Sequence, residues 1–148
     1  MPIKPENKAR YPKNWSEIRT SILARAKDCC EQCGAKNKTR IARGEGEYAD
    51  TYQTVDADVF CANTGKFLGR IRMSDYCVKN MVDIVLTIAH LDHTPENCDP
   101  SNLKALCQRC HLRYDATLHS ENARLTRKNR KAIADLFSSF PALKGGAA

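Results

Sequence analysis

Residues 88–115 concentrate the side chains that can carry chemistry in this chain of 148 residues. The stretch reads IAHLDHTPENCDPSNLKALCQRCHLRYD and holds three histidines, three aspartates and three cysteines. A neutral imidazole can take a proton from water near neutral pH, and imidazole together with carboxylate can hold one divalent cation. This combination suits hydrolysis of a phosphodiester, which needs a base for the water and a cation for the charge that builds on the phosphate oxygens.

Two CxxC pairs predict a second kind of site, a structural metal site. Cys30 and Cys33 lie in CEQC, and Cys107 and Cys110 lie in CQRC. Each short turn offers two sulfurs to one ion, so we expect one zinc on all four thiolates, provided that the fold brings the distant pairs together. Two separate redox pairs, or reduced buried thiols, are the alternatives. Buried or free thiols are expected at the remaining cysteines: Cys29, Cys61, Cys77 and Cys98.

The stretch resembles the HNH endonuclease family, in its phage or bacterial type. The ββα-metal motif of that family runs strand, histidine, loop, Asn-Leu, short strand, CxxCH, helix, and residues 83–115 follow this order, with Asn102-Leu103 and Cys110-His111 at the matching places. The likeness extends to the upstream CEQCG. It implies metal-dependent hydrolysis of DNA phosphodiester bonds, by nicking or cleavage, that leaves 5′-phosphate and 3′-hydroxyl ends. It also implies a structural Zn²⁺ and a catalytic Mg²⁺ or Mn²⁺.

Two alignments of the histidines with this family remain open. In the one that we prefer, AHLDHTPENCDPSNL aligns without a gap and His90 is the general base, twelve residues before Asn102. In the other, Asp92 is a metal ligand and His93 is the base. The preferred alignment puts Ala89 where the family usually has its first metal ligand, so Asp92 or His93 must replace it.

The resemblance also assigns roles beyond the base. It implies that Asn102 ties the loop together and holds the backbone of the base, and that His111 is a ligand of the catalytic ion. Asp115 lies one helical turn after His111, which makes it a plausible third ligand beside Asp92. Plainer roles are a turn cap for Asp92, a place on the loop surface for His93 and an ordinary helix carboxylate for Asp115.

The pattern around these residues predicts an α+β fold. We expect a small ββα-metal core of treble-clef type at residues 82–118, an N-terminal helix tied to it by zinc, an insertion with a β-hairpin at 36–80 and a basic helix at 121–137. These parts form a single domain at 14–137, between a flexible basic arm at 1–13 and a disordered tail at 138–148. The individual elements are expected as follows: a helix over 15–28 that begins in a capping box of Asn14 and Glu17, a polar loop over 36–58, a hairpin over 56–72 that turns at 63–66, one strand over 82–90, a short strand or turn over 102–106, and a helix over 110–118.

The charge is unevenly spread along the chain. The net charge is +7, and residues 1–40, 41–100 and 101–148 carry +6, −5 and +6. Basic ends favour a nucleic acid as partner, here DNA, bound by a protein that is a monomer or a weak homodimer. A zinc-stabilised DNA-binding module without catalysis is the alternative to an enzyme. The expected DNA-binding residues are Arg113, Arg124, Arg127, Lys128, Arg130 and Lys131.

The sequence carries no long apolar run and begins without a signal peptide, so we expect no membrane partner. The expected compartment is the cytoplasm of a bacterial or phage-infected cell.

Overall fold

A computed structural model describes the backbone of residues 5–138 and the side chains of residues 7–133. Its contacts divide the chain into a first unit, which ends at Leu112, and a second unit, which begins at Arg113. Helices and antiparallel sheets both occur, so the predicted α+β class is confirmed. The first residues of the predicted arm, 1–4, and the predicted tail from residue 139 onward lie outside the described residues.

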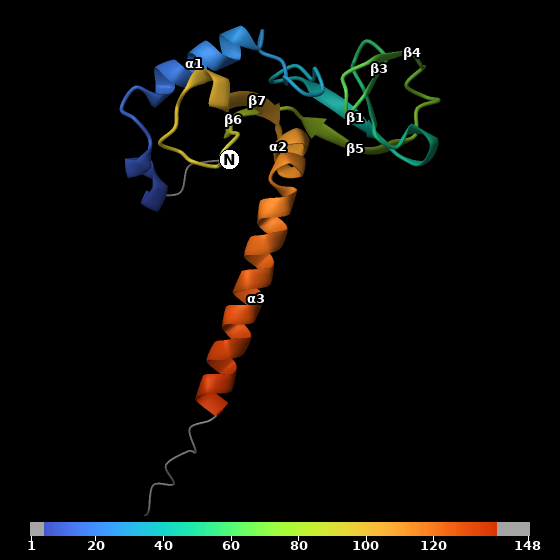
Figure 1. The fold of residues 1–148 in the computed structure, drawn as a ribbon. Helices are drawn as coiled ribbons and strands as arrows, with labels where there is room; N and C mark the ends of the chain where they lie inside the picture. The colour runs from blue at the N-terminus through green and yellow to red at the C-terminus, as the bar shows by residue number, and fades with distance from the viewer. Residues whose placement is uncertain (1–4, 139–148) are drawn as a thin grey trace, which may run out of the picture. The chain divides into compact units, whose positions relative to one another are not determined.

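Most strands of the first unit form one antiparallel sheet of five strands, in the order β4-β3-β2-β1-β5 (Figure 1). The register pairs Ala42 with Gln53, and Ile41 with Val82 on the other side of β1. The predicted hairpin with its turn at 63–66 is confirmed, since its two strands pair across that turn. The strands of this sheet are β1 (Arg40–Gly44), β2 (Thr51–Gln53), β3 (Asp58–Cys61), β4 (Phe67–Arg70) and β5 (Val78–Asp83).

The second sheet is a pair of strands that leads directly into a helix. β6 (Leu86–His90) pairs antiparallel with β7 (Leu103–Cys107), so that His90 lies opposite Leu103. The loop between them ends in a 3₁₀ turn, η3 (Pro100–Asn102). α2 (Gln108–Tyr114) begins at the residue after β7. The strand that we predicted near 102–106 is therefore confirmed, and the helix after it starts two residues earlier than predicted.

The N-terminal region is more ordered than an arm. A 3₁₀ helix, η1 (Pro5–Arg10), precedes α1 (Trp15–Arg25), and Arg10 forms an ion pair with Glu96 at 2.6 Å. Within the predicted arm, residues 5–10 thus form a 3₁₀ helix, and the Arg10 side chain contacts the loop after β6.

The ends of α1 also differ from the prediction. The capping box does not form, since the Asn14 side chain makes no capping hydrogen bond. The helix stops at Arg25 rather than at Asp28, because Lys27 and Asp28 adopt positive φ angles of 52° and 55°.

Two further predictions fail in the same region of the sequence. The polar stretch 36–58 was expected as a loop, but it supplies β1 and β2; both Ile41 and Ala42 are buried, so the alternation that marks a strand is absent. The single strand expected over 82–90 is two strands in different sheets. The chain leaves β5 at Asp83 and enters β6 at Leu86, and the fully buried Ile84 between them continues the apolar run without a visible break.

The main core of the first unit joins both sheets to α1. Ile22 of α1 packs with Ile41 and Tyr52 of the larger sheet and with Leu86 and Leu103 of the smaller one. The four CxxC cysteines lie inside this same cluster. The core is therefore built around the predicted metal site.

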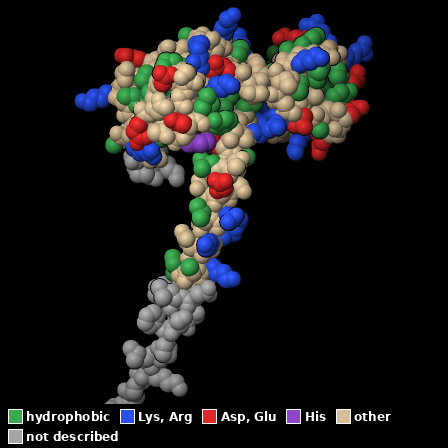
Figure 2. Space-filling model, in the orientation of Figure 1, with side chains coloured by type: hydrophobic (Ala, Val, Ile, Leu, Met, Phe, Trp, Pro, Cys, Tyr) green, Lys and Arg blue, Asp and Glu red, His purple; other side chains and the backbone are tan. Residues whose placement is uncertain are grey.

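The second unit begins with the last two residues of α2, Arg113 and Tyr114, and continues as α3 (Ala116–Ser138) as far as the structure describes it. α3 replaces two predicted pieces, the end of the 110–118 helix and the 121–137 helix, since the chain breaks helical form at Asp115 and then continues without interruption. His119 lies inside α3. Lys and Arg side chains recur along α3 in Figure 2. No helix within residues 5–138 is both long and apolar enough to span a membrane.

Candidate metal centre and histidine loop

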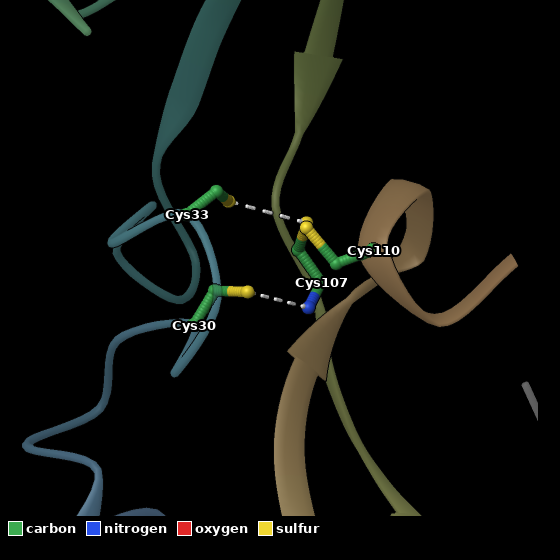
Figure 3. Close-up of side chains that lie close together, drawn as sticks. All are labelled: Cys30, Cys33, Cys107 and Cys110. Carbon is green, nitrogen blue, oxygen red and sulfur yellow. Dashed lines mark hydrogen bonds between the residues drawn. The ribbon is translucent and has the colours of Figure 1, made fainter. Parts of the chain in front are cut away.

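The four CxxC cysteines meet in the core of the first unit (Figure 3). Cys30 and Cys33 lie on the turn after α1, Cys107 ends β7 and Cys110 lies in the first turn of α2. Their sulfur atoms are all within 4.8 Å of one another, and all four residues are buried. The predicted convergence of the two distant pairs is confirmed.

Backbone pairing explains why the first CxxC turn reaches the second. Glu31 donates its N–H to the Ala105 carbonyl at 2.9 Å, and its carboxylate accepts the Ala105 N–H at 2.7 Å. Arg25 donates to the same carboxylate at 3.0 Å and to the Leu103 carbonyl at 2.7 Å. The turn is thereby attached to β7 like a short extra strand, which places Cys30 and Cys33 beside Cys107.

A glycine of the large sheet completes this packing. Gly65, in the β3–β4 turn, has φ +74° and lies so close to the turn that a Cβ would come within 3.0 Å of the Cys33 carbonyl carbon. Any other residue would be strained by its φ angle and would press on the Cys33 backbone. The hairpin therefore covers the cysteine turn only because position 65 is glycine.

The cysteine geometry fits a tetrahedral ion. Zinc–sulfur bonds of 2.3 Å in a tetrahedron put sulfurs about 3.8 Å apart, and the Cys33 and Cys107 sulfurs lie 3.6 Å apart. The Cys107 N–H donates to the Cys30 sulfur at 3.3 Å, as donors around metal thiolates do. Hydrogen bonds within the cluster divide the cysteines: they lower the pKa of the Cys107 thiol, with Cys110 the first cause, and raise the pKa of Cys33 and Cys110, with Cys107 the first cause. Four thiolates leave no open position, so an ion here is structural.

The loop between β6 and β7 is organised by Asn102. Its Oδ1 accepts the Asp92 N–H at 3.1 Å, its Nδ2 donates to Asp92 Oδ1 at 2.9 Å and to the Asn97 carbonyl at 2.9 Å. Its carbonyl accepts the Leu91 N–H at 2.8 Å. These bonds hold the backbone that follows His90, which is the role expected for Asn102.

The Asp92 carboxylate accepts its hydrogen bonds from within this loop. It accepts hydrogen bonds from Asn102, from the Asn97 amide at 2.8 Å and from the Thr94 N–H at 2.8 Å. These donors, Asn102 first, lower the pKa of Asp92 to about 2. The side chain therefore caps the turn, and its oxygens are already engaged by three donors.

His90 lies at the end of β6 beneath aromatic rings. It is 8% exposed, its ring stacks on Trp15 at 5.3 Å and it meets the edge of Tyr11 at 5.7 Å. Its Nε2 lies 3.9 Å from the Cys98 sulfur. Burial lowers the pKa of His90, with Asp92 and Glu96 opposing this effect and His111 adding to it, so the imidazole is kept neutral.

His111 lies on α2 and is oriented by β6. Its Nδ1 is 2.7 Å from the Thr87 hydroxyl oxygen, which lies 3.4 Å from the Leu106 carbonyl. Either atom can be the donor in the contact between Thr87 and Nδ1, so Thr87 fixes the orientation of the imidazole.

The remaining predicted site residues are more dispersed. His93 is exposed in a left-handed turn with φ 57°. Asp115 belongs to the second unit, where its carboxylate lies 3.9 Å from His119 Nε2. Within the described residues, the four cysteines are the one group in which three or more ligand residues bring their ligand atoms within 4.8 Å of one another. The set Asp92, His111 and Asp115 is not such a group.

The predicted DNA-binding residues all belong to the second unit and are exposed. Five lie on α3, and four of these follow one face at spacings of three and four residues: Arg124, Arg127, Lys128 and Lys131. Arg130 lies off this face, and Arg113 lies in α2.

Several residues of the site escaped the sequence reasoning. Glu31 attaches the cysteine turn, Thr87 orients His111, and Tyr11 and Trp15 cover His90. A sequence signal was available for Thr87 alone, because the two-residue period of a strand places it on β6 near the second CxxC pair. No known protein family, curated protein or solved structure matches this chain.

Proposed function

We propose that this protein is a metal-dependent nuclease of the HNH type that hydrolyses DNA phosphodiester bonds. The order β6, loop, β7, CxxC, α2 around a buried cysteine cluster supports the ββα-metal assignment. The observation that carries the proposal is the place of His111, which follows Cys110 on α2 and whose ring is oriented by Thr87 of β6 through Nδ1. A second ion held there would stabilise the charge on the phosphate oxygens.

The general base in this proposal is a neutral imidazole of the β6 end. Burial keeps His90 uncharged, which suits proton abstraction from water near neutral pH. His93, three residues beyond the end of β6, is the exposed alternative, and Asn102 holds the backbone between the two histidines. The Asp92 carboxylate is occupied by hydrogen bonds of the loop. In this proposal His111 is therefore the more direct ligand of the ion.

A plasmid-nicking assay tests this proposal. The zinc-loaded protein is incubated with supercoiled DNA and Mg²⁺, Mn²⁺ or no added ion. His111→Ala should lower the nicking rate at least about a hundredfold, while His119→Ala, a helix histidine of the second unit, should stay within about twofold. His90→Ala and His93→Ala are each checked for an unchanged melting temperature. The variant that loses nicking activity then identifies the general base.

A DNA-binding module without catalysis is the second candidate function. It is favoured by the cover over His90, by the three donors on Asp92 and by the buried Ala89 where a ligand is expected. Wild-type protein that binds DNA but never nicks it with either ion would establish this second function and end the first.

A further inference from the structure

A hollow with a volume of about 600 Å³ lies in the first unit, and its lining includes none of the four cysteines and none of the predicted histidines. Its walls come from β1, the segment around η2 (Gly46–Tyr48), β5 and the first turns of α2. Volumes of roughly 300–1,000 Å³ are usual for small-molecule sites. Most residues of this hollow belong to the stretch 36–80, for which sequence patterns predicted only an insertion.

Arg43 is the unusual side chain of the hollow. It is half-buried, its guanidinium carbon lies 5.6 Å from the centre of the Tyr52 ring, and its Nη1 is buried without a hydrogen-bond partner. No hydrogen bond from Nη1 to a described residue is formed. A buried arginine donor without an acceptor is costly. The structure thus supplies a cation and leaves its acceptor to come from elsewhere.

The other charges of the hollow define which acceptor fits. Lys79, on the exposed rim, is a second cation. Arg109 is already engaged by the Asp50 carboxylate, by the Ala62 carbonyl at 2.7 Å and by Asn63 Oδ1 at 3.0 Å. Glu45 is the remaining acid of the lining. Because Arg109 neutralises Asp50, the hollow offers Arg43 and Lys79 against one carboxylate, which favours an anion.

The apolar part of the lining adds a second requirement. Val82 and Leu112 face the hollow together with Ala49, and Gly44 and Gly46 leave the wall open beside Arg43. Gly44 cannot be replaced without collision, since a Cβ would come within 2.6 Å of the Tyr76 hydroxyl. An anion alone would leave this apolar wall uncovered, whereas a phosphate attached to a flat ring would use both parts.

We propose that the hollow binds one nucleotide unit, with its phosphate on Arg43 and Lys79 and its base or sugar against Val82 and Leu112. This inference goes beyond the proposed nuclease activity, because it requires neither cleavage nor a catalytic ion. The nucleotide is either free or part of a nucleic-acid strand, and both sources present the same phosphate chemistry.

Binding measurements without added divalent ion test the site independently of cleavage. The full-length, zinc-loaded chain is titrated with adenosine 5′-monophosphate and inorganic phosphate by calorimetry, and with a labelled 12-nucleotide single-stranded DNA by anisotropy. Arg43→Met keeps the aliphatic stem over Tyr52 but removes the donors. Lys79→Gln changes an exposed rim position that the fold does not need. Arg72→Gln, at an exposed arginine outside the hollow, is the matched control.

We expect Arg43→Met to weaken binding roughly ten- to a hundredfold, Lys79→Gln about two- to fivefold, and Arg72→Gln less than twofold. Losses measured with the monophosphate identify a free nucleotide as ligand. Losses confined to the 12-nucleotide DNA identify a nucleic-acid strand as the ligand. In that case the slope of log affinity against log salt concentration should be smaller by about 0.7 in Arg43→Met. Either result supports the site.

Three results would overturn the inference. The first is wild-type affinity for both ligands in Arg43→Met and in Lys79→Gln. The second is inorganic phosphate that binds as tightly as the monophosphate, since the apolar wall would then contribute nothing. The third is a wild-type chain that binds neither nucleotide probe. If Arg43→Met does not fold, Lys79→Gln decides alone.

Discussion

The cysteine cluster and the histidine loop lie at opposite ends of β7 and are built in different ways. The cluster is buried and attached through backbone pairing of Glu31 with Ala105, so little of it can move without breaking the core. The loop is exposed and held by the side chains of Asn102 and Asp92. The difference indicates that backbone pairing holds the first region in the core, whereas side-chain hydrogen bonds hold the second at the surface.

The same contrast appears in the chemistry of the two regions. Four thiolates close the coordination of an ion and leave no place for substrate. The histidines offer ring nitrogens: His111 on α2 is oriented by Thr87, and His90 at the end of β6 is covered by Trp15. Substitutions in the cluster should therefore unfold the first unit, while substitutions in the loop should change local ionisation and leave the core folded.

The largest effect is expected from removing one sulfur of the cluster. Cys107→Ser should abolish stable zinc binding and cooperative unfolding of the first unit, because a structural zinc site contributes roughly 10 kcal/mol or more to folding in small domains. Metal analysis and thermal melting check this. Cys77→Ser, at an exposed cysteine outside the cluster, is the control and should keep both properties. A Cys107→Ser variant that melts like the wild type would contradict a structural role for the ion.

A smaller and local effect is expected from the loop. Asn102→Ala should raise the pKa of Asp92 from about 2 toward its ordinary value, because Asn102 is the strongest of the donors that lower it. NMR titration of the aspartate carboxyls measures this change, and zinc content should stay at the wild-type level. Ser101→Ala serves as the neighbouring control. An unchanged Asp92 pKa would mean that Asn102 does not organise the loop.

The pH dependence of stability should report His90. Its pKa in the fold is lowered by burial, so the unfolded chain binds the proton more readily. The contribution of His90 to stability is therefore full above the unfolded pKa of about 6.5 and declines as the pH falls below it. Asp92 and Glu96, which oppose the shift, and His111, which adds to it, surround the ring.

Trp15 provides the measurement, since it is the single tryptophan of the chain. It stacks on the imidazole, and a charged imidazole quenches indole fluorescence, so the emission should drop with a midpoint below pH 6.5. His90→Phe should remove the transition. A midpoint above 6.5, or a transition that persists in His90→Phe, would contradict the buried neutral state.

The smallest effect is expected at the ion pair between Arg10 and Glu96. Both side chains are about half exposed, and exposed pairs contribute little because water screens them. Arg10→Gln should lower the melting temperature by less than about 3 °C. A shift several times larger would mean that the N-terminal segment is part of the folded core rather than a cover attached at its surface.

Sequence patterns predicted the parts that depend on local spacing. The CxxC pairs, the hairpin around residues 63–66 and the short strand before Cys107 follow from a few neighbouring residues. The patterns failed where distant contacts decide. Ile41 and Ala42 are buried on opposite faces of β1, which hides the strand, and Ile84 continues an apolar run through the junction of two sheets. The cover of Tyr11 and Trp15 over His90 joins segments about eighty residues apart, which no local pattern records.

Cobalt substitution tests the four-thiolate ion most directly. The 148-residue chain is loaded with Co²⁺ in place of Zn²⁺ and the absorption spectrum is recorded, with folding followed in parallel. We predict one ion per chain, the intense sulfur-to-cobalt charge-transfer and visible bands of a tetrahedral thiolate site, and unfolding of the first unit when the ion is removed. A metal-free chain that folds with the same cooperativity, or a spectrum without thiolate bands, would contradict the account.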